Sequence, residues 1–322
     1  RGRQVKWNLS NARVPGLTFA ATIPERAAGS DAALAATNVK QLTFTDTQGI
    51  DLAAFSLPSL IKYKAFDGLE IPAFVYTPAG YTKGTRIPFI VYYHGGPEGQ
   101  SEAGFIGRNN YFLSELGVAL VYPNVRGSTG YGKQYVALDN GEKREDSVKD
   151  LWALLDWIAS QPELDAERVM IMGGSYGGYM TLAASVHFAD RIRCAVDIVG
   201  ISNFVTFLEH TEAYRQDLRR VEYGDERVPA MRAKLQEISP LTRAGEIKKP
   251  LFVIQGRNDP RVPASEAEQI VATLQQRGTP VWYLEGKDEG HGFQKKRNQD
   301  YQMYATILFM QTYLLDGMAA NR

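Results

Sequence analysis

The feature that most constrains this fold is the run Gly-Gly-Ser-Tyr-Gly at residues 173–177, which lies between an apolar run and a helix-forming run. A short strand, a G-x-S-x-G turn and a helix make the sequence pattern of a nucleophile elbow. The turn is so sharp that a side chain at Gly173 or Gly177 would collide with neighbouring backbone, and it holds Ser175 in a strained conformation. The pattern therefore exposes the Ser175 hydroxyl and directs the Tyr176 N–H at an oxygen that becomes negative during acyl transfer. A glycine-rich turn that happens to contain serine is the alternative, and the rest of the chain decides between the two.

Composition and charge narrow the classes of protein to which the chain can belong. Of its 322 residues, 44% are hydrophobic and 22% are charged, which is typical of a globular protein with one large α/β domain and a smaller part. The 36 basic and 36 acidic residues cancel, so nothing favours a nucleic-acid or anionic-membrane partner. No apolar run approaches the ~20 residues of a membrane span. We therefore expect no nucleic acid and no membrane among its partners. The oligomeric state stays open, a homo-oligomer included.

The single cysteine and the first residue bear on processing and location. Cys194 lies in the apolar run 194–199, which predicts a buried thiol, and a lone cysteine excludes a disulfide within the chain. The chain begins with Arg1 and shows no signal-peptide pattern, so we expect a processing or cloning boundary there. These features fit a cytoplasmic and a periplasmic protein equally well.

Two parts of different character follow one another along the chain. Residues 1–56 hold short β-prone runs around an Ala/Gly-rich spacer, from Ala27 to Thr37, that we expect to be flexible. From residue 57 to 322, strands alternate with helices, and the long apolar strands indicate a mostly parallel sheet covered by helices on both faces. The segment 201–247 reads as irregular. The expected strands are 61–65 and 71–76, joined by a turn at Asp67 and Gly68, then 89–93, 118–122, 169–172, 194–199, 251–254 and 281–284, and the expected helices are 147–160, 179–184, 264–277 and about 298–315.

Two loops at strand ends supply partners for Ser175. Asp259 follows the strand 251–254, and His291 follows the strand 281–284. In an open α/β sheet, ligands bind beyond the carboxyl ends of the strands, which is where both loops fall. The chain order Ser175, Asp259, His291 is the one that accompanies a nucleophile elbow. We therefore expect His291 to accept the Ser175 proton and return it to the leaving group, and Asp259 to hold the imidazole in the required tautomer.

Few other residues compete for these roles. His187 lies well along the helix after the elbow, where packing or surface exposure is the expected role. His210 lies in the irregular segment and has no carboxylate-bearing loop of its own. Asp288 is the chief rival of Asp259, but it lies only three residues before His291, in the same loop. We therefore place Asp259 ahead of it.

The loop after the strand 89–93 is a candidate oxyanion loop. It begins with His94, Gly95, Gly96 and a proline. Glycines here let the backbone pass close to a substrate and direct amide N–H groups at a developing oxyanion. A simple strand-end turn is the alternative. Its position makes the loop the expected second half of an oxyanion hole, opposite the Tyr176 N–H.

Together these motifs resemble the catalytic domain of the prolyl oligopeptidase family of serine peptidases. The shared motifs are the elbow Gly-Gly-Ser-Tyr-Gly-Gly-Tyr, His-Gly-Gly-Pro at 94–97, the run 124–132, the segment 258–263 and Glu-Gly-His-Gly-Phe at 289–293. They follow the family's order and are most similar to its bacterial acylaminoacyl-peptidase and dipeptidyl-peptidase-like branch. The resemblance implies an α/β-hydrolase fold for residues 57–322. It also implies that residues 1–56 are the remnant of an N-terminal β-propeller, which screens substrates by size in the family and is otherwise missing here.

The resemblance also assigns roles to single residues. The family's triad falls on the three residues named above, and its oxyanion amide falls on Tyr176. Some relatives use a tyrosine hydroxyl as the second oxyanion donor where this chain has His94, so we assign that donor to the backbone at Gly95 and Gly96. Arg261 matches a residue that in some members hydrogen-bonds a carbonyl of the bound peptide, which suits a guanidinium. A surface arginine is the alternative.

The segment 204–223 matches the region that lines the family's specificity pocket. Aromatic residues there and around the elbow would form an apolar pocket for the residue whose carbonyl is attacked, although core packing explains any one of them equally well. The expected pocket residues are Tyr176, Tyr179, Phe204, Phe207, Tyr214, Tyr223 and Val262.

Charged residues elsewhere carry structural expectations. The balanced charges between Arg215 and Glu226 favour a solvated helix face over a binding patch. Arg126 is expected to brace a turn beside the site. Acidic residues such as Glu145 and Asp146 are candidate partners for it, although the sequence does not show which residue it pairs with.

The sequence thus predicts a serine peptidase of aminopeptidase or oligopeptidase type, which cleaves oligopeptides through an acyl-enzyme on Ser175 without metal or cofactor. A carboxylesterase with the same triad is the first alternative, because a triad does not by itself separate esters from amides. A non-catalytic binding module is the second, and the presence of all three triad residue types disfavours it. The expected partner is a peptide substrate, whose residue preference and mode of cleavage stay open.

Overall fold

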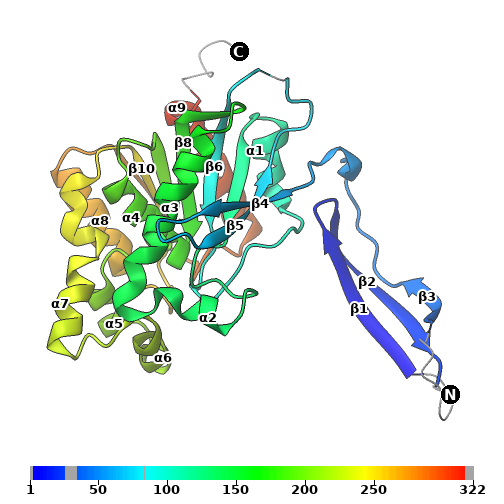
Figure 1. Ribbon diagram of the computed structural model, residues 1–322, viewed down its shortest axis with the longest axis horizontal. Coiled ribbons are helices and arrows are strands. Elements are labelled where there is room, and N and C mark those ends of the chain that lie inside the picture. Colours follow the sequence, from blue (N-terminus) through cyan, green and yellow to red (C-terminus); the bar gives the residue numbers. More distant parts are fainter. Residues whose placement is uncertain (1–2, 26–34, 83, 316–322) are drawn as a thin grey trace.

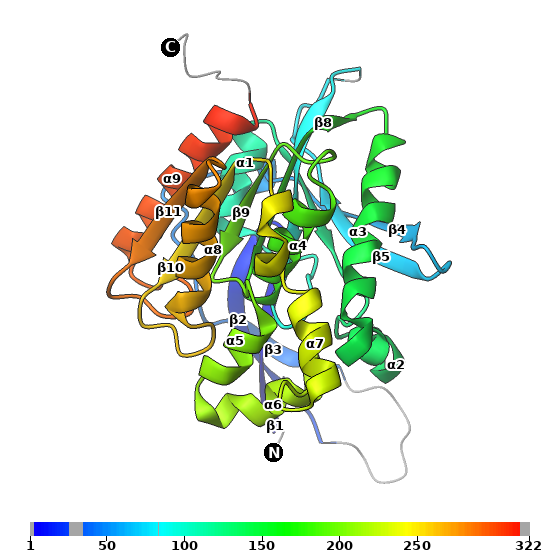
Figure 2. The same ribbon diagram turned by 90° about the vertical axis from the view of Figure 1, so that its left-hand side faces the viewer.

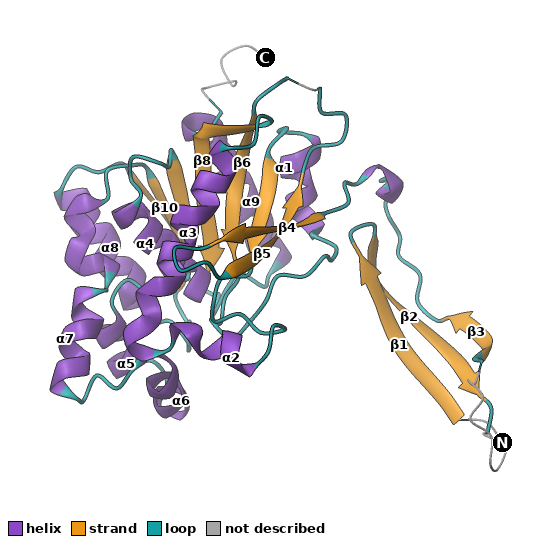
Figure 3. Ribbon diagram, in the orientation of Figure 1, coloured by secondary structure: helices purple, strands orange, loops and turns teal. Residues whose placement is uncertain are grey.

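The structure of the chain is a computed structural model that describes residues 3–25, 35–82 and 84–315. Most of these residues form an α/β body in which one large sheet lies between layers of helices, and a small separate sheet projects from that body (Figures 1 and 3). Most of the expected flexible spacer lies outside the described residues.

The large sheet has eight strands in the order β11-β10-β9-β8-β6-β7-β5-β4. From β11 to β7 all neighbours are parallel, whereas β5 and β4 run antiparallel at one edge. The mostly parallel sheet predicted from the sequence is therefore confirmed. Its strands are β4 (Ser59–Lys64), β5 (Glu70–Tyr76), β6 (Ile87–Tyr93), β7 (Ala119–Pro123), β8 (Leu164–Gly174), β9 (Cys194–Ile198), β10 (Leu251–Gly256) and β11 (Val281–Gly286).

Helices connect most of these strands. In the described residues the α-helices are α1 (Asn110–Ser114), α2 (Lys133–Val136), α3 (Arg144–Ala159), α4 (Tyr176–His187), α5 (Phe204–His210), α6 (Ala213–Tyr223), α7 (Pro229–Glu237), α8 (Ala264–Gln276) and α9 (Lys296–Tyr313). Short 3-10 helices are η1 (Leu52–Ala54), η2 (Gly107–Asn109), η3 (Ala137–Asp139), η4 (Gly141–Lys143) and η5 (Pro240–Glu246).

Each face of the sheet is buried by its own layer of helices. In β6, Phe89 and Val91 enter the core beneath α3, α4 and α8, whereas Ile90 points into the opposite core beneath α1 and α9. Figures 1 and 2 show these two layers on either side of the strands. Because both faces are covered, the central strands are continuous apolar runs rather than alternating ones. This burial is what made them visible in the sequence.

The expected hairpin at the sheet edge is also confirmed. β4 and β5 pair antiparallel, with Ile61 opposite Ala73. Gly68 in the connecting turn has φ 84°, and its N–H donates to the Ala65 carbonyl oxygen at 3.0 Å. A residue with positive φ is the role for which glycine is suited.

The segment expected to be irregular is helical, which corrects the sequence prediction. Residues 201–247 include α5, α6, α7 and η5. Asn203 begins α5 by accepting a hydrogen bond from the Val205 N–H. The buried Glu266 carboxylate of α8 accepts from the N–H groups of Ser202 at 3.0 Å and Asn203 at 2.8 Å, which fixes this start. α5 and α7 are short, so their apolar positions are too few to show a clear 3.6-residue period. In α6 the apolar positions with helical spacing, Tyr214, Leu218 and Val221, face solvent rather than the core.

The small sheet is formed by β1 (Arg3–Asn11), β2 (Val14–Ile23) and β3 (Thr37–Gln41), which pair antiparallel in that order. Every residue of β1 and β3 is exposed. Trp7 stacks on Phe19 with ring centroids 5.8 Å apart. Among its contacts with the body, the Arg13 Nε donates to the Phe55 carbonyl oxygen at 2.8 Å. The division at residue 56 and the origin of this sheet in a propeller remain predictions.

Two further expectations from the sequence concern the lone cysteine and membrane-spanning helices. Cys194 is fully buried, as predicted, and burial raises the pKa of its thiol. Among the described residues, no helix combines the length and the apolarity needed to cross a bilayer.

Candidate active site

The nucleophile elbow has the geometry that its glycines predict. Ser175 lies between β8 and α4 with φ 60° and ψ −117°, and its N–H donates to the Ile198 carbonyl oxygen at 2.9 Å. A Cβ added at Gly173 would collide with the Gly177 carbonyl, and one added at Gly177 would collide with the Tyr93 carbonyl. Glycine is therefore required at both positions, and Ser175 is held in the left-handed region that side chains rarely adopt.

Asp259 and His291 form a hydrogen-bonded pair. The Asp259 Oδ2 lies 2.7 Å from the His291 Nδ1. The Asp259 side chain is fully buried, and its Oδ1 accepts from the N–H groups of Arg261 at 2.8 Å and Val262 at 3.0 Å. With a proton on Nδ1 donated to this carboxylate, the Nε2 of a neutral imidazole is a proton acceptor.

All three residues of the predicted triad lie at the carboxyl edge of the parallel strands. Ser175 follows β8, Asp259 follows β10 and His291 follows β11. The loops after β10 and β11 touch, because the Asn258 N–H donates to the Glu289 carbonyl oxygen at 2.9 Å. Within the described residues the Ser175 hydroxyl makes no hydrogen bond. In unliganded sites of this kind, the catalytic hydrogen bonds tighten when substrate binds.

The loop that carries His291 is held in place by the buried carboxylate of Glu289, a role that the sequence analysis did not predict. Glu289 is only 3% exposed. Its carboxylate accepts from the N–H groups of Gln294 at 2.9 Å and Lys295 at 3.1 Å, and from the Asn298 side chain at 2.6 Å. Its position two residues before the histidine was the available signal, but a glutamate in a polar loop reads as a surface residue.

The rival residues lie elsewhere in the fold. The Asp288 side chain is 58% exposed and pairs with Lys295 rather than with the histidine. His187 lies 3.5 Å from the Glu145 carboxylate at the end of α4, and His210 is exposed at the end of α5.

The expected oxyanion loop lies directly against the elbow. A Cβ added at Gly95 would lie 3.3 Å from the Ser175 Cβ. The His94 ring does not face the serine, because its Nε2 lies 2.9 Å from the Ser128 hydroxyl and its Nδ1 lies 2.9 Å from the Gly95 carbonyl oxygen. Burial lowers the pKa of His94. These contacts leave the backbone of Gly95 and Gly96 as the part of the loop that can face an oxyanion.

Most of the expected pocket residues gather into one aromatic cluster. Phe204 lies at its centre, with ring centroids 4.6 Å from Tyr179 and 5.0 Å from Tyr223. Phe207 contacts Tyr223 from the side, and all four rings are buried. Tyr176 adjoins the cluster and Val262 packs in the same core, whereas Tyr214 is 74% exposed and shares no ring contact with these residues. Arg261 is exposed beside Asp259.

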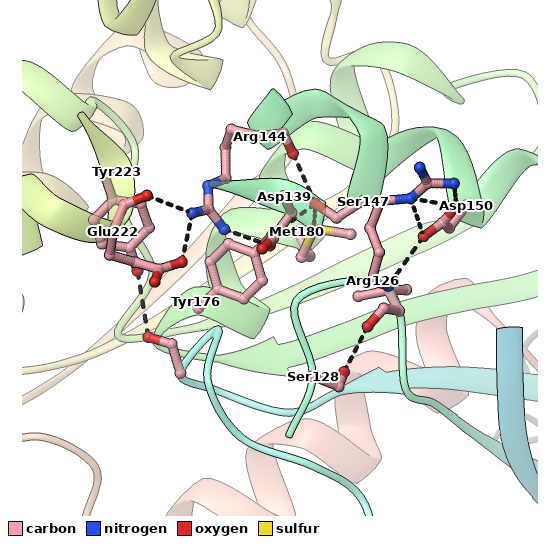
Figure 4. A network of polar contacts seen from close by, with 12 residues as sticks. Arg126, Ser128, Asp139, Arg144, Ser147, Asp150, Tyr176, Met180, Glu222 and Tyr223 are labelled. Carbon is pink, nitrogen blue, oxygen red and sulfur yellow. Dashed lines mark hydrogen bonds and ion pairs between the residues drawn. The ribbon is translucent and has the colours of Figure 1, made fainter. Parts of the chain in front are cut away.

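Two arginines beside the site, Arg126 and Arg144, are buried in ion pairs that the sequence did not predict (Figure 4). Arg126 pairs with Asp150 at 2.8 Å and with Asp67 at 3.0 Å, rather than with the candidate partners Glu145 and Asp146. Arg126 and Asp150 are each almost inaccessible, whereas an arginine after a strand reads in sequence as a surface turn.

The second arginine, Arg144, pairs with Asp139 and with Glu222 of α6. On the same segment Arg220 pairs with Glu226, whose side chain is 2% exposed. The charges between residues 215 and 226 are therefore not a uniformly solvated face, which corrects that prediction.

A metal centre finds no support among the described residues, since they contain no group of three or more His, Cys, Asp or Glu side chains arranged to hold an ion. The chemistry available at the elbow is that of a serine hydroxyl, an imidazole and a buried carboxylate.

Comparison with known sequences identifies relatives. Residues 104–316, more than half of the chain, match the prolyl oligopeptidase family. Dipeptidyl aminopeptidase BIII of Pseudoxanthomonas mexicana is 42% identical over 217 residues, which cover 66% of this chain and 31% of that protein. The human acylamino-acid-releasing enzyme is 26% identical over 258 residues, which cover 77% of this chain and 34% of that enzyme. The chain thus spans about a third of the length of these relatives.

Solved structures agree with this assignment. A puromycin-hydrolyzing peptidase of Mycobacterium tuberculosis superposes with a TM-score of 0.85 at 26% identity, covering 97% of this chain and 46% of that one. The acylaminoacyl peptidase of Pyrococcus horikoshii superposes with a TM-score of 0.83 at 23% identity, covering 98% of this chain and 49% of that one, and shows a likeness of fold. The fold predicted from the elbow and the strand order is that of α/β-hydrolase peptidases, and the chain belongs to the prolyl oligopeptidase family of serine peptidases.

Proposed function

We propose that this chain hydrolyses peptide bonds of oligopeptides through an acyl-enzyme on Ser175. The observation that carries the proposal is the buried Asp259 carboxylate 2.7 Å from the His291 Nδ1, at the same edge of the sheet as a serine held in a strained elbow. Membership of a family of serine peptidases supports the same reaction.

In the first half of the reaction, the Ser175 Oγ attacks the substrate carbonyl carbon while its proton passes to the His291 Nε2. The carbonyl oxygen becomes an oxyanion, which the Tyr176 N–H and the backbone at Gly95 or Gly96 would stabilise. The C–N bond then breaks, the imidazolium gives its proton to the leaving amine, and the acyl group stays on Ser175.

In the second half, water attacks the acyl carbon and gives a proton to His291, which returns it to the Ser175 oxygen as the ester bond breaks. The role of Asp259 throughout is to orient the imidazole and stabilise its protonated form. Two backbone amides already satisfy its Oδ1, so the Oδ2 that faces the histidine cannot rotate away without losing them.

Substrate binding rests on the residues around this centre. The aromatic cluster of Tyr179, Phe204, Phe207 and Tyr223 would support, from within the core, the pocket for the residue whose carbonyl is attacked, whereas the exposed Tyr214 is free to contact substrate from the surface. Arg261 lies next to the catalytic carboxylate, where its guanidinium can bind a peptide carbonyl. The named relatives differ in substrate, since one is a dipeptidyl aminopeptidase and another releases acylamino acids, so both a free and a blocked amino terminus have to be tested.

The decisive experiment is a kinetic comparison on the purified chain. Acyl-peptidyl amides, dipeptidyl amides with a free amino terminus and simple p-nitrophenyl esters are assayed side by side, with Ser175→Ala as the matched variant. We expect amide hydrolysis that falls at least 10³-fold in Ser175→Ala, because the nucleophile is lost while binding and the oxyanion hole remain.

Normal amide turnover by Ser175→Ala would refute the nucleophile. Hydrolysis of esters alone would refute peptidase action by this chain and favour the carboxylesterase. Circular dichroism and the unfolding midpoint of the variant show whether a loss of turnover reflects the missing hydroxyl or a loss of fold.

A further inference from the structure

The Arg144 guanidinium is sealed inside the protein next to the proposed oxyanion hole. Arg144 begins α3 and is completely buried. Its Nη1 donates to Asp139, and its Nη2 donates to the Glu222 carboxylate at 2.6 Å and to the Glu222 carbonyl oxygen at 2.9 Å. Figure 4 shows the guanidinium between these acidic residues. The side chain therefore ties α3 to the end of α6.

The same guanidinium contacts two aromatic rings. Its central carbon lies 5.2 Å from the centroid of Tyr176 and 4.8 Å from that of Tyr223. The Tyr176 hydroxyl lies 2.7 Å from the Ser147 hydroxyl and donates to Asp139 at 3.3 Å. Each ring is thus held by a cation–π contact, and the Tyr176 ring also by hydrogen bonds to the network around Arg144.

Both rings belong to residues that set the position of an oxyanion donor. Tyr176 follows the nucleophile directly, so anchoring its ring fixes the peptide that carries its N–H. The Tyr223 hydroxyl donates to the Gly96 carbonyl oxygen at 3.3 Å, and the Arg219 Nη1 donates to the same oxygen at 3.2 Å. The orientation of the loop at Gly96 is therefore fixed from α6. The Arg144 guanidinium therefore contacts both the residue that carries the Tyr176 N–H and the residue that binds the loop at Gly96.

We infer that Arg144 is a positioning residue that holds the two halves of the oxyanion hole at the spacing required to bind the transition state. The inference rests on the proposed function, since it concerns the oxyanion formed on Ser175. Arg144 touches neither substrate nor nucleophile, and it acts through Tyr176 and Tyr223.

Charge strengthens this role. Arg144 is buried with two acidic residues, Asp139 and Glu222, and burial raises the pKa values of both carboxyl groups while the guanidinium lowers them. Without the guanidinium, two carboxyl groups would remain behind the site where the substrate oxygen becomes negative. Any negative charge that they retained would oppose the oxyanion, and protonating them would break the contacts that order Tyr176 and Glu222.

A neighbouring ion pair, Arg220 with Glu226, provides a control that distinguishes positioning of the oxyanion hole by Arg144 from simple anchoring of α6. Arg220 binds the buried Glu226 with three hydrogen bonds and so fastens the same helix. The contacts of its guanidinium in the described residues are with acidic side chains, and none is with Tyr176, Tyr223 or Gly96. Arg220→Met is therefore the control for the removal of an ion-paired, half-buried arginine at this end of α6.

The test compares Arg144→Met and Arg144→Lys with Arg220→Met, using the best peptide amide of the substrate panel. For each variant three quantities are measured: kcat/KM, the Ki of the corresponding peptide aldehyde, and the Ki of a reduced-amide peptide that has CH₂ in place of the carbonyl. The aldehyde adds to the Ser175 hydroxyl and places its oxygen in the oxyanion hole, whereas the reduced amide has no oxygen to place there.

For Arg144→Met we expect kcat/KM and aldehyde affinity to fall together by about 30-fold or more, approaching the ~10²-fold loss of one oxyanion donor. The reduced amide should bind within about threefold of the parent, because ground-state contacts do not use the oxyanion hole. For Arg144→Lys, kcat/KM and aldehyde affinity should lie between those of Arg144→Met and the parent, because lysine keeps the positive charge but lacks the planar guanidinium. Arg220→Met should change all three quantities by less than about threefold while lowering the unfolding midpoint.

Aldehyde affinity of Arg144→Met within about threefold of the parent would overturn the role of Arg144. An equal loss for the reduced amide would also overturn it, because that result reports a general distortion. If Arg144→Met does not fold, Arg144→Lys decides: a selective aldehyde loss of at least about fivefold is expected, and no loss overturns the inference. Aldehyde binding or turnover that persists in Ser175→Ala would instead refute the proposed function itself.

Discussion

At the scale of single residues, Asp197 is a buried carboxylate beneath the elbow. It lies on β9 opposite Gly173, and a Cβ added at Gly178 or Gly200 would collide with its Oδ1. Neither of its oxygens has a well-formed hydrogen bond to another described residue, and the nearby Gly200 backbone only partly compensates. Burial therefore raises the pKa of Asp197 from its ordinary 3.8 to about 7.

This shift makes folding stability depend on pH. A carboxyl group with a raised pKa stabilises the fold fully below its unfolded pKa, and that contribution is lost as pH rises through about 7. Asp197→Asn cannot ionise, so relative to the parent it should gain roughly 2–3 kcal/mol between pH 5 and pH 8, at ~1.4 kcal/mol per pKa unit. Urea unfolding of both proteins at the two pH values measures this gain.

The control is Asp156→Asn on the surface of α3, where the side chain is 58% exposed. Its stability relative to the parent should be the same at both pH values. If the free energies of unfolding of Asp197→Asn and the parent differ by the same amount at pH 5 and pH 8, the prediction is contradicted. Any fixed cost of burying an amide cancels, because only the change between the two pH values is compared.

Residues with a local motif could be predicted, and residues defined only by burial could not. Ser175 was identified by its glycines, and the candidates Asp259 and His291 by strand order. Arg144 has no such pattern, and the motif that contains Glu289 gave no sign that its carboxylate is buried, because charged residues at a helix start or in a polar loop are usually exposed. Their importance comes from segments that are distant in sequence and pack over them.

At the scale of elements, the loop after β11 presents His291 while Glu289 holds it in place. Glu289→Gln keeps the shape but replaces one acceptor oxygen with an NH₂ group, which would face the backbone N–H of Gln294 or Lys295. We expect kcat/KM to fall about tenfold with little change in KM, because the imidazole is less well aligned with Ser175.

The adjacent residue supplies the control for this prediction. Asp288→Asn changes an exposed carboxylate one position away and should leave kcat/KM within about twofold. Steady-state kinetics on the same amide measures both variants. Equal effects of the two substitutions would show that the buried carboxylate has no special part in holding the loop.

The strands that the sequence revealed most directly are those buried on both faces. β6, β10 and residues 169–172 of β8 contain continuous apolar runs, and the order of these strands placed the candidate site at one edge of the sheet. α5, α6 and α7 are short, and α6 is largely polar because its buried side includes Arg220, Glu222 and Tyr223. The apolar residues of α6 at helical spacing, Tyr214, Leu218 and Val221, face solvent and therefore do not mark its buried side. This is why the segment 201–247 was expected to be irregular.

At the scale of the whole molecule, the small N-terminal sheet and the α/β body are structurally distinct (Figure 1). The strands β1 to β3 pair only with one another, and β1 and β3 are exposed throughout. Removing residues 1–50 would keep the Phe55 ring against Phe105, whose centroids lie 5.9 Å apart. The shortened chain should unfold within a few degrees of the parent and retain turnover of the best amide within about threefold.

Thermal unfolding and the amide assay on the shortened chain measure this prediction. A large drop in the unfolding midpoint would show that the sheet is part of the cooperative unit. A selective loss of turnover in a stable shortened chain would show that the sheet takes part in catalysis.

The order of strands has a consequence for how activity is lost. The proposed nucleophile, Ser175, follows β8, an interior strand with a parallel neighbour on each side. The proposed base, His291, follows β11, the outermost strand with a single neighbour. Local opening of a sheet begins where a strand has the fewest partners. On heating, we therefore expect His291 to leave the proposed site before Ser175 leaves its turn. Loss of activity should then precede unfolding of the interior strands, and cooling at that stage should restore activity through the return of β11 and its loop.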